Sequence, residues 1–262
     1  MIKQSHFCTF FGKNGDRMNA EREKKILERL LATKKVTVKE LAAELFSSEP
    51  SIRRDLIHLE SQGYLRRVHG GAILEEQGIS ASRIPFVIRE LEESDAKLVM
   101  AKQAISLVRD NDVLFLDASS SAYQLIPCLT LKHNLTVITN GVKALSLLAK
   151  YNIKTISTGG EMMASCLSLV GEECHKTLSA YRADIAFFSC RGLSEDGELT
   201  DISCEEDYVR QKMFANAKRQ YLLCAGNKIG NVYYHRLCHA KDLTGIISDV
   251  TLPDGISRYQ II

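Results

Sequence analysis

The stretch of residues 40–74 constrains the fold of this chain more than any other stretch. It contains two short segments of apolar periodicity separated by a tight turn, and it ends in a basic run around paired glycines. Such periodic segments form helices, and a glycine turn between two short runs of strand-forming residues forms a hairpin. We therefore predict a winged helix-turn-helix, in which the second helix and a small hairpin share one surface.

Capping signals predict where the helices of this region begin. Thr37 and Glu40 are three residues apart, the spacing at which a hydroxyl and a carboxylate each accept from the other residue's free amide. Ser48 is suited to cap the second helix of the motif. A preceding helix is expected over residues 20–32, with Asn19 as its N-cap.

The second helix of the motif has an inward and an outward face. Ile52, Leu56 and Leu59 recur at i, i+4 and i+7, so they must face the core. The cap, the outward face and the hairpin supply the candidates for contact with DNA: Ser48, Ser51, Arg53, Arg54, His58, Arg66, Arg67 and His69. A solvated charged face would explain any one of them. The set favours a DNA-reading module, because phosphate contacts supply affinity and base-edge contacts supply sequence preference.

The charge of this region is positive but small. Residues 18–71 carry eleven lysines and arginines against eight acidic residues, while the whole chain of 262 residues has a net charge of +2. One module with so few cations should bind DNA weakly by itself. We therefore expect a homo-oligomer, a dimer or a tetramer, that reads two half-sites of a double-stranded operator.

Changes in composition predict four segments. They are a loose extension over residues 1–17, the winged helix-turn-helix over residues 18–74, a linker over residues 75–93 and an α/β domain over residues 94–262. The linker prediction is based on a polar, mixed composition with a glycine and a proline. Met18 stands where a compact domain would begin, so it is an alternative start of the protein.

The last segment has the pattern of a parallel sheet. Six apolar runs alternate with helical stretches, at residues 113–117, 135–139, 153–157, 185–189, 221–224 and 245–248. Near-continuous apolar strands separated by helices are typical of a mostly parallel sheet that is covered on both faces. In such sheets a ligand binds beyond the carboxyl ends of the strands.

Those strand ends are rich in small polar residues. Small residues let backbone amides approach an anion, and the helix N-terminus that follows favours negative charge. Turn geometry alone explains any single example, but several at equivalent ends favour an anion pocket. The candidates for contact with an effector are Asp117, Ser119, Ser120, Ser121, Thr139, Asn140, Gly159, Gly160, Arg191 and Lys228.

Several motifs resemble the signature of one family. The runs SIRRDL at residues 51–56 and RVHGGA at residues 67–72, with Leu59, Glu60 and Gly63 between them, look like the DeoR family of bacterial repressors. The likeness extends to about residue 230. It implies that the helix carrying Ser51, Arg53 and Arg54 enters the major groove. Asp55 is expected to orient an arginine, since a carboxylate near phosphates is unfavourable.

The resemblance also implies an effector. The family's second domain is similar in fold to sugar-phosphate isomerases such as ribose-5-phosphate isomerase, which implies a phosphorylated sugar or a related metabolite as ligand. The implied binding groups are the serine loop after Asp117, the pairs at residues 139–140 and 159–160, and Lys228. The implied function is a transcriptional regulator, a repressor of sugar or carbohydrate metabolism genes.

Two positions depart from the family pattern. Family members commonly carry Asp-x-Ser-Lys where this chain has Ala225, Gly226, Asn227 and Lys228. Arg191 stands where the family usually has a small or neutral residue. It could pair with Asp117 or Glu205, or contact a more anionic effector. An alternative that these departures leave open is an unregulated DNA-binding protein.

A sugar-phosphate isomerase with a DNA-binding appendage is the alternative from another functional class. Isomerisation needs a base over a sugar carbon, and Asp117, Glu161, Glu205 and Glu206 are conceivable bases. No carboxylate has a sequence partner that singles it out, so we expect a regulator with no catalytic residues and no cofactor.

The remaining composition excludes several other classes. Eight scattered cysteines without CxxC spacing favour reduced thiols over disulfides or a metal site. No apolar run approaches the roughly 18 residues of a membrane span. We expect a cytoplasmic protein.

Overall fold

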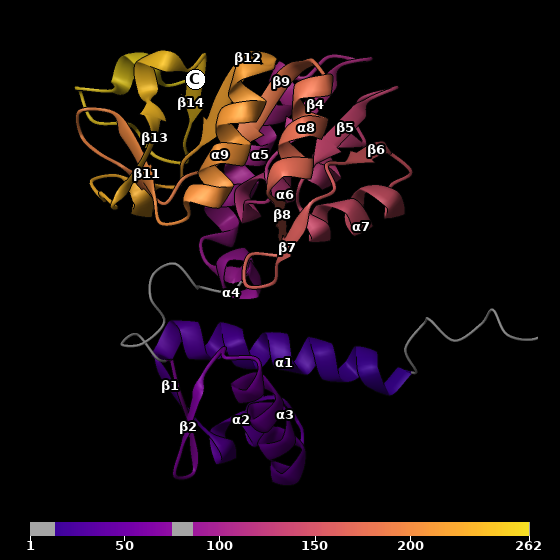
Figure 1. The fold of residues 1–262 in the computed structure, drawn as a ribbon. Coiled ribbons are helices and arrows are strands. Elements are labelled where there is room, and N and C mark those ends of the chain that lie inside the picture. The colour runs from indigo at the N-terminus through magenta and orange to yellow at the C-terminus, as the bar shows by residue number, and fades with distance from the viewer. Residues whose placement is uncertain (1–13, 75–85, 262) are drawn as a thin grey trace, which may run out of the picture. The chain divides into compact units, whose positions relative to one another are not determined.

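The computed structural model describes residues 14–74 and 86–261. The chain divides into two compact units, Met1–Ser80 and Ala81–Ile262. Both units are drawn in Figure 1.

The first unit is the predicted winged helix-turn-helix. Its three strands form an antiparallel sheet in the order β1-β3-β2, and its core includes Ile26, Leu41, Ile52, Leu56 and Leu59. Strand β1 was not predicted, because three residues give no periodicity. The elements are α1 (Asn14–Thr33), β1 (Lys35–Thr37), α2 (Val38–Glu44), α3 (Glu49–Ser61), β2 (Arg66–Val68) and β3 (Gly71–Ile73).

The helix starts test the capping predictions. The capping box is confirmed, since the Glu40 amide donates to Thr37 Oγ1 at 3.2 Å and the Thr37 amide to Glu40 Oε2 at 3.1 Å. Ser48 caps α3 as expected. Asn19 was wrong as an N-cap: α1 begins at Asn14, and Asn19 Oδ1 accepts from Arg22 Nη2 at 2.8 Å. An asparagine costs a helix interior only about 0.7 kcal/mol, too little to end it.

The second unit is built on a six-stranded parallel sheet in the order β14-β12-β9-β4-β5-β6. All six predicted strands are present. Strand β12 begins four residues before its predicted start, where the polar side chains of residues 218–220 hide it. The strands are β4 (Val113–Leu116), β5 (Thr136–Thr139), β6 (Lys154–Ser157), β9 (Ala183–Phe188), β12 (Ala217–Leu223) and β14 (Gly245–Ile247).

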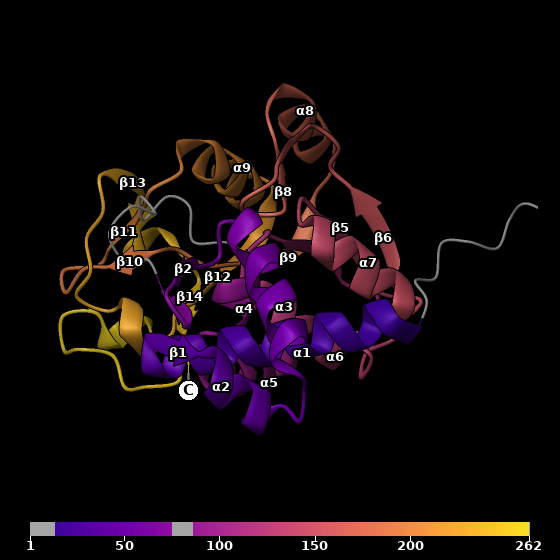
Figure 2. The same cartoon turned by 90° about the horizontal axis from the view of Figure 1, so that it is seen from below.

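Helices cover both faces of this sheet, as predicted. On one face Leu114 and Leu116 pack with α5 (Ser94–Leu107), α6 (Ser120–Leu129) and α7 (Val142–Lys150). On the other face Phe115 packs with α8 (Glu172–Ala180) and α9 (Cys204–Ala215). Figure 2 shows α8 and α9 on the opposite side of the strands from α6 and α7. The alternation of side chains along β4 gives the three layers.

Several short elements were not predicted from the sequence. Helix α4 (Phe86–Leu91) lies inside the expected linker, whose residues 75–85 are outside the described part of the chain. The expected extension over residues 1–17 also lies mostly outside the described part of the chain. The others are two small antiparallel sheets, β7 (Glu161–Met163) with β8 (Ser168–Val170), and β10 (Gly192–Leu193), β11 (Glu198–Asp201) and β13 (His235–His239), and the 3₁₀ turns η2 (Gly226–Lys228), η3 (Ala240–Asp242) and η4 (Ser257–Tyr259).

Other sequence expectations concern thiols, metals and membranes. The seven cysteines within the described residues are free thiols. Over the same residues no cluster of three or more His, Cys, Asp or Glu side chains could hold a metal ion. None of the helices in the described ranges is both long and apolar enough to cross a membrane.

Candidate DNA-reading surface and ligand pocket

Helix α3 presents two exposed arginines. Because Ile52, Leu56 and Leu59 are buried, the residues between them point away from the core. Arg53 donates to Glu49 Oε2 at 3.1 Å, and Arg54 Nη2 donates to Ser51 Oγ at 3.3 Å. Exposed contacts of this kind contribute little stability, so a phosphate or a base edge can replace them at small cost.

Asp55 orients an arginine, as expected, but that arginine comes from another helix. Arg22 of α1 donates two hydrogen bonds to the Asp55 carboxylate, from Nε to Oδ2 at 2.5 Å and from Nη2 to Oδ1 at 2.9 Å. Asp55 is buried, so the pair is shielded from water. Bidentate pairs fix geometry as well as adding energy. The clamp therefore sets the position of α3 on α1.

Two other DNA-contact candidates are engaged inside the unit. His58 Nδ1 lies 2.7 Å from Glu23 Oε1 of α1. Arg67 donates to the Glu60 carboxylate through both its backbone amide and its Nε, each at 2.8 Å. The hydrogen bond from the backbone amide is the main cause that lowers the pKa of Glu60. Both side chains would have to leave a carboxylate to reach DNA.

The hairpin lies beside the outward face of α3. Arg53, Arg67 and His69 line a common hollow between α3 and the wing. Gly71 lets β3 pair closely with β1, since a Cβ there would stand 2.0 Å from the Val36 carbonyl oxygen. Gly70 turns the hairpin with a φ of +77°. Arg53 thus shares one surface with the wing, whereas the other helix candidates, Ser51, Arg54 and His58, line a second hollow beside α1.

The second unit has a polar pocket of about 180 Å³ at the carboxyl ends of β4, β9 and β12. Of the predicted effector residues, Ser119, Ser120, Arg191 and Lys228 line it. The other thirteen lining residues were not among the predicted effector contacts, and they include Arg89, Lys97, Ser189, Asn231 and Tyr233. Arg89 and Lys97 come from the segment before the sheet, where strand-end reasoning does not reach.

The remaining candidates do not line this pocket. Thr139 Oγ1 accepts from the Gly141 amide at 3.0 Å, and Asn140 Nδ2 donates to the Leu169 carbonyl at 3.1 Å. Gly160 has a φ of +110°, and a Cβ there would stand 2.3 Å from the Val170 carbonyl oxygen. These turns support the β7–β8 hairpin. The other predicted effector residues that do not line the pocket are Asp117, Ser121 and Gly159.

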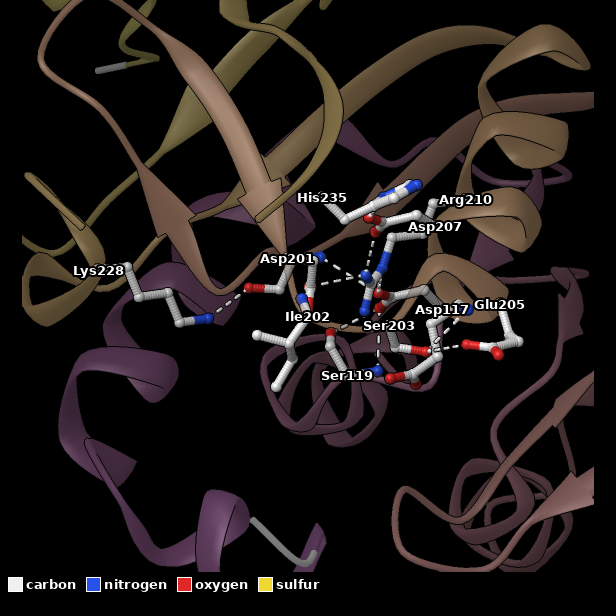
Figure 3. Close-up of polar contacts among 12 residues, drawn as sticks. Asp117, Ser119, Asp201, Ile202, Ser203, Glu205, Asp207, Arg210, Lys228 and His235 are labelled. Atoms are coloured by element: carbon white, nitrogen blue, oxygen red, sulfur yellow. Dashed lines mark hydrogen bonds and ion pairs between the residues drawn. The ribbon is translucent and has the colours of Figure 1, made fainter. Parts of the chain in front are cut away.

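Asp117 belongs to a buried ionic network below the pocket, shown in Figure 3. Arg210 of α9 donates to Asp117 Oδ2 at 3.0 Å, to Asp201 Oδ2 at 2.8 Å and to Asp207 Oδ1 at 2.8 Å. His235 Nδ1 lies 2.6 Å from Asp207 Oδ2, and burial raises the pKa of Asp207. The Arg210 guanidinium therefore links the carboxyl end of β4, strand β11 and helix α9 to one another.

Asp117 is also bound by its neighbours. Its Oδ1 accepts from the Ser119 hydroxyl at 2.5 Å, and its Oδ2 accepts from the Ser189 amide at 3.3 Å. The pairing of Arg191 with Asp117 or Glu205 that we considered is not formed, because Arg210 holds Asp117 and Ser203 donates to Glu205.

Five cations and four carboxylates line the pocket. Arg210 is paired with aspartates, whereas the other four cations repel one another. Burial first, and Lys228 next, lower the pKa of Lys97 to about 7. Burial and the neighbouring Arg89 lower the pKa of Arg191, and burial lowers that of Lys228. Lys228 Nζ donates to Ser189 Oγ at 2.6 Å, so it points inward despite the changed residues before it. A cluster of like charges, of which Lys97 is buried and the others half-buried, favours binding of an anion.

Two polar groups of the pocket lack partners. The Nε and Nη2 atoms of Arg89 are buried without a hydrogen-bond partner, and so is Oε1 of Glu206. A buried guanidinium without an acceptor is costly, and a phosphate or carboxylate would satisfy it. The free oxygen of Glu206 would accept from a ligand hydroxyl. The pocket therefore combines anion binding with one site for a hydroxyl donor.

Comparisons with known proteins cover both units. The model of the DeoR-like helix-turn-helix domain matches residues 22–78, and that of the DeoR C terminal sensor domain matches residues 92–250. The chain is 31% identical to the L-fucose operon activator of Haemophilus influenzae, over 91% of this chain and 95% of that one.

Two further similarities are with a repressor and an isomerase. The chain is 30% identical to the lactose phosphotransferase system repressor of Staphylococcus epidermidis, over 82% of this chain and 85% of the relative. The ribose 5-phosphate isomerase of Methanocaldococcus jannaschii matches 53% of this chain and 55% of its own at 22% identity, with a TM-score of 0.40.

Proposed function

The chain belongs to the DeoR family of transcriptional regulators, and on this premise we propose that it represses sugar-metabolism genes and senses a phosphorylated sugar. One observation carries the choice of ligand. The buried guanidinium of Arg89 lacks acceptors at Nε and Nη2, in a pocket that also holds Lys97, Arg191 and Lys228. Guanidinium and ammonium groups converging on one small cavity suit a phosphate.

Glu206 supports the sugar part of the proposal. Its unpartnered Oε1 in the same pocket would accept a hydrogen bond from a hydroxyl. A ligand with only a phosphate would leave that oxygen unsatisfied, at a cost of about 1 to 3 kcal/mol. A phosphorylated polyol or sugar satisfies both ends of the pocket.

Thermal unfolding with a panel of sugar phosphates tests the ligand proposal. A ligand at about 100 times its Kd should stabilise the second unit by about 2.7 kcal/mol. The unphosphorylated sugars should give no shift, and Lys228→Met should abolish the effect. Absence of a shift with every sugar phosphate, in a protein that still binds its operator, would favour the unregulated DNA-binding protein.

On the DNA side, we propose that Arg53 and Arg54 read base edges and that the wing contacts phosphates. Arg53→Ala or Arg54→Ala should remove discrimination between operator and random duplex. Arg66→Ala should weaken binding to both DNAs equally and reduce the salt slope by about one. Arg236→Ala, in the second unit, is the matched control. Unchanged discrimination in the double variant of Arg53 and Arg54 would refute the assignment.

Assembly and location follow from the DNA proposal. The small charge surplus of the first unit supports a dimer or a tetramer that places two copies on a palindromic operator, in the cytoplasm where the DNA lies. Binding curves should depend on protein concentration, and a half-site should bind far more weakly than the full operator. Equal affinity for both would exclude cooperation between copies.

We propose that the protein regulates and does not catalyse. Of the four conceivable bases, Asp117 is held by Arg210, and of the other three only Glu206 lines the pocket. Turnover assays on pentose and hexose phosphates should detect no isomerisation, and no cofactor should be needed. Isomerisation that disappears in Glu206→Gln would establish the enzyme instead.

A further inference from the structure

We propose that Arg89 binds the effector directly and that helix α4, which carries it, passes the occupancy of the pocket on to the linker before it. This inference depends on the proposed function, since it assumes an anionic ligand in the pocket. Helix α4 (Phe86–Leu91) directly follows residues 75–85, the segment that joins the two units along the chain. Helix α4 is therefore the first described element of the second unit after that segment.

One side of α4 is attached to the second unit independently of the pocket. Phe86 is buried and meets the Tyr123 ring edge-on, with centroids 5.6 Å apart. The Phe86 amide donates to the Ser165 carbonyl at 3.1 Å, and Lys143 of α7 forms an ion pair with Glu90. These contacts locate the start of the helix, so α4 stays near the pocket when the pocket is empty.

The other side of α4 reaches into the pocket through Arg89. The Arg89 Cζ lies 5.5 Å from the centre of the Phe86 ring, which supports one face of the guanidinium. Its Nε and Nη2 are nevertheless buried without an acceptor. In an empty pocket this arrangement opposes docking of α4, because two donors have lost water and gained nothing. An anion that bridges Arg89 to Arg191 or Lys228 reverses that balance.

The end of α4 is tied to the same pocket by Lys97. The Lys97 ammonium donates to the carbonyls of Arg89 and Glu92, which are among the last acceptors of the helix. A cation at a helix C-terminus is favourable, but Lys228 and Arg89 repel this one. A bound anion relieves the repulsion, so it strengthens the hold of Lys97 on α4.

The turn after α4 stores strain. Glu93, between α4 and α5, has a φ of +51°, a left-handed conformation that costs a residue other than glycine about 1 to 3 kcal/mol. Lys97 holds the turn through its hydrogen bonds to the Arg89 and Glu92 carbonyls. Strain in the turn and unpaired charge thus oppose the docked state of α4, and a bound anion favours it. A ligand with higher affinity for the docked state shifts the population toward it.

Hydrogen exchange of the full chain, with inorganic phosphate as the probe, tests the proposal. In the wild type, saturating phosphate should slow exchange over residues 86–97 and over residues 226–231 beside Lys228. Arg89→Gln should weaken phosphate binding by about 10- to 100-fold. At phosphate concentrations that still fill its pocket, it should retain the protection at 226–231 and lose that at 86–97. Arg236→Gln, an exposed arginine outside the pocket, should behave as the wild type.

The outcomes separate this inference from the proposed function. If Lys228→Met abolishes phosphate binding while Arg89→Gln matches the wild type in affinity and in protection over residues 86–97, the role of α4 is refuted and the pocket stands. If phosphate does not bind the wild type at all, the inference is refuted, and the panel of sugar phosphates decides on the proposed function. Arg89→Lys keeps a cation but loses the planar fork, so intermediate affinity with reduced protection supports the inference even if Arg89→Gln is unstable.

Discussion

Replacing Arg210 by methionine tests whether one guanidinium holds the floor of the pocket together. The Arg210 side chain is 5% exposed, and its three carboxylate partners are no more exposed than that. Methionine keeps much of the volume but leaves Asp117, Asp201 and Asp207 without their shared cation. Removing one partner of a buried ion pair costs about 3 to 5 kcal/mol. We expect a loss of at least that size, a large part of the stability of a typical domain.

Urea unfolding followed by far-ultraviolet circular dichroism measures this loss. The matched control is Arg236→Met, which removes an exposed ion pair with Glu198 at 3.1 Å and should cost less than about 1 kcal/mol. The second unit contains the six-stranded sheet, so its transition is the one that should move.

The pH dependence gives a second check. Burial raises the pKa of Asp207, while Arg210 lowers it. Without Arg210 the folded-state pKa of Asp207 should rise further. A carboxyl whose folded pKa exceeds its unfolded pKa stabilises the fold at low pH and loses that contribution as pH rises through the folded pKa. The deficit of Arg210→Met relative to the wild type should therefore shrink from about pH 8 to about pH 5. A loss no larger than that of Arg236→Met, or a deficit that grows on acidification, would refute the reasoning.

Three other features described above can be tested by substitution. Arg22→Met or Asp55→Asn should destabilise the first unit by about 1.5 to 3 kcal/mol, with strong coupling in the double-mutant cycle, because each breaks the bidentate clamp; additive losses would show that the clamp is unimportant. Burial lowers the pKa of Lys97 from its ordinary 10.5 to about 7. At pH values between these two, Lys97 is therefore protonated in the unfolded chain and neutral in the folded protein. The stability of the wild type relative to Lys97→Met should then rise with pH between about 7 and 10.5 in urea titrations, and a flat difference would contradict this. Gly160→Ala should lower the melting temperature much more than Gly159→Ala, because only the former places a Cβ against a carbonyl oxygen, and equal effects would count against that clash.

The parts of the fold that were predictable have local causes. The apolar runs of β4, β9 and β14 gave the strands, since a strand buried on both faces needs little more than such a run. The cap of α2 was readable because Thr37 and Glu40 satisfy each other within four residues. The antiparallel strands β10, β11 and β13 were missed because short, mixed strands carry no comparable signal.

The pocket was predictable only where it is made by strand ends. Ser119 and Lys228 follow β4 and β12 directly, so the rule for parallel sheets located them. Arg89 escaped because a six-residue helix shows too few turns to reveal a face. The Arg210 network escaped for another reason: its partner Asp117 is 93 residues away in sequence, and only the tertiary fold brings them together.

The strand order has a consequence for synthesis of the protein. The central pair of the sheet joins Leu114 of β4 to Ile185 of β9, so the second unit cannot assemble until the ribosome has produced most of the chain. The described helices and strands of the first unit all lie within residues 14–74, so its reading surface can form much earlier. Each nascent polypeptide thus passes through an interval in which the DNA reader precedes its own sensor. The small charge surplus of that reader limits how firmly such an immature chain would hold DNA before its pocket has formed.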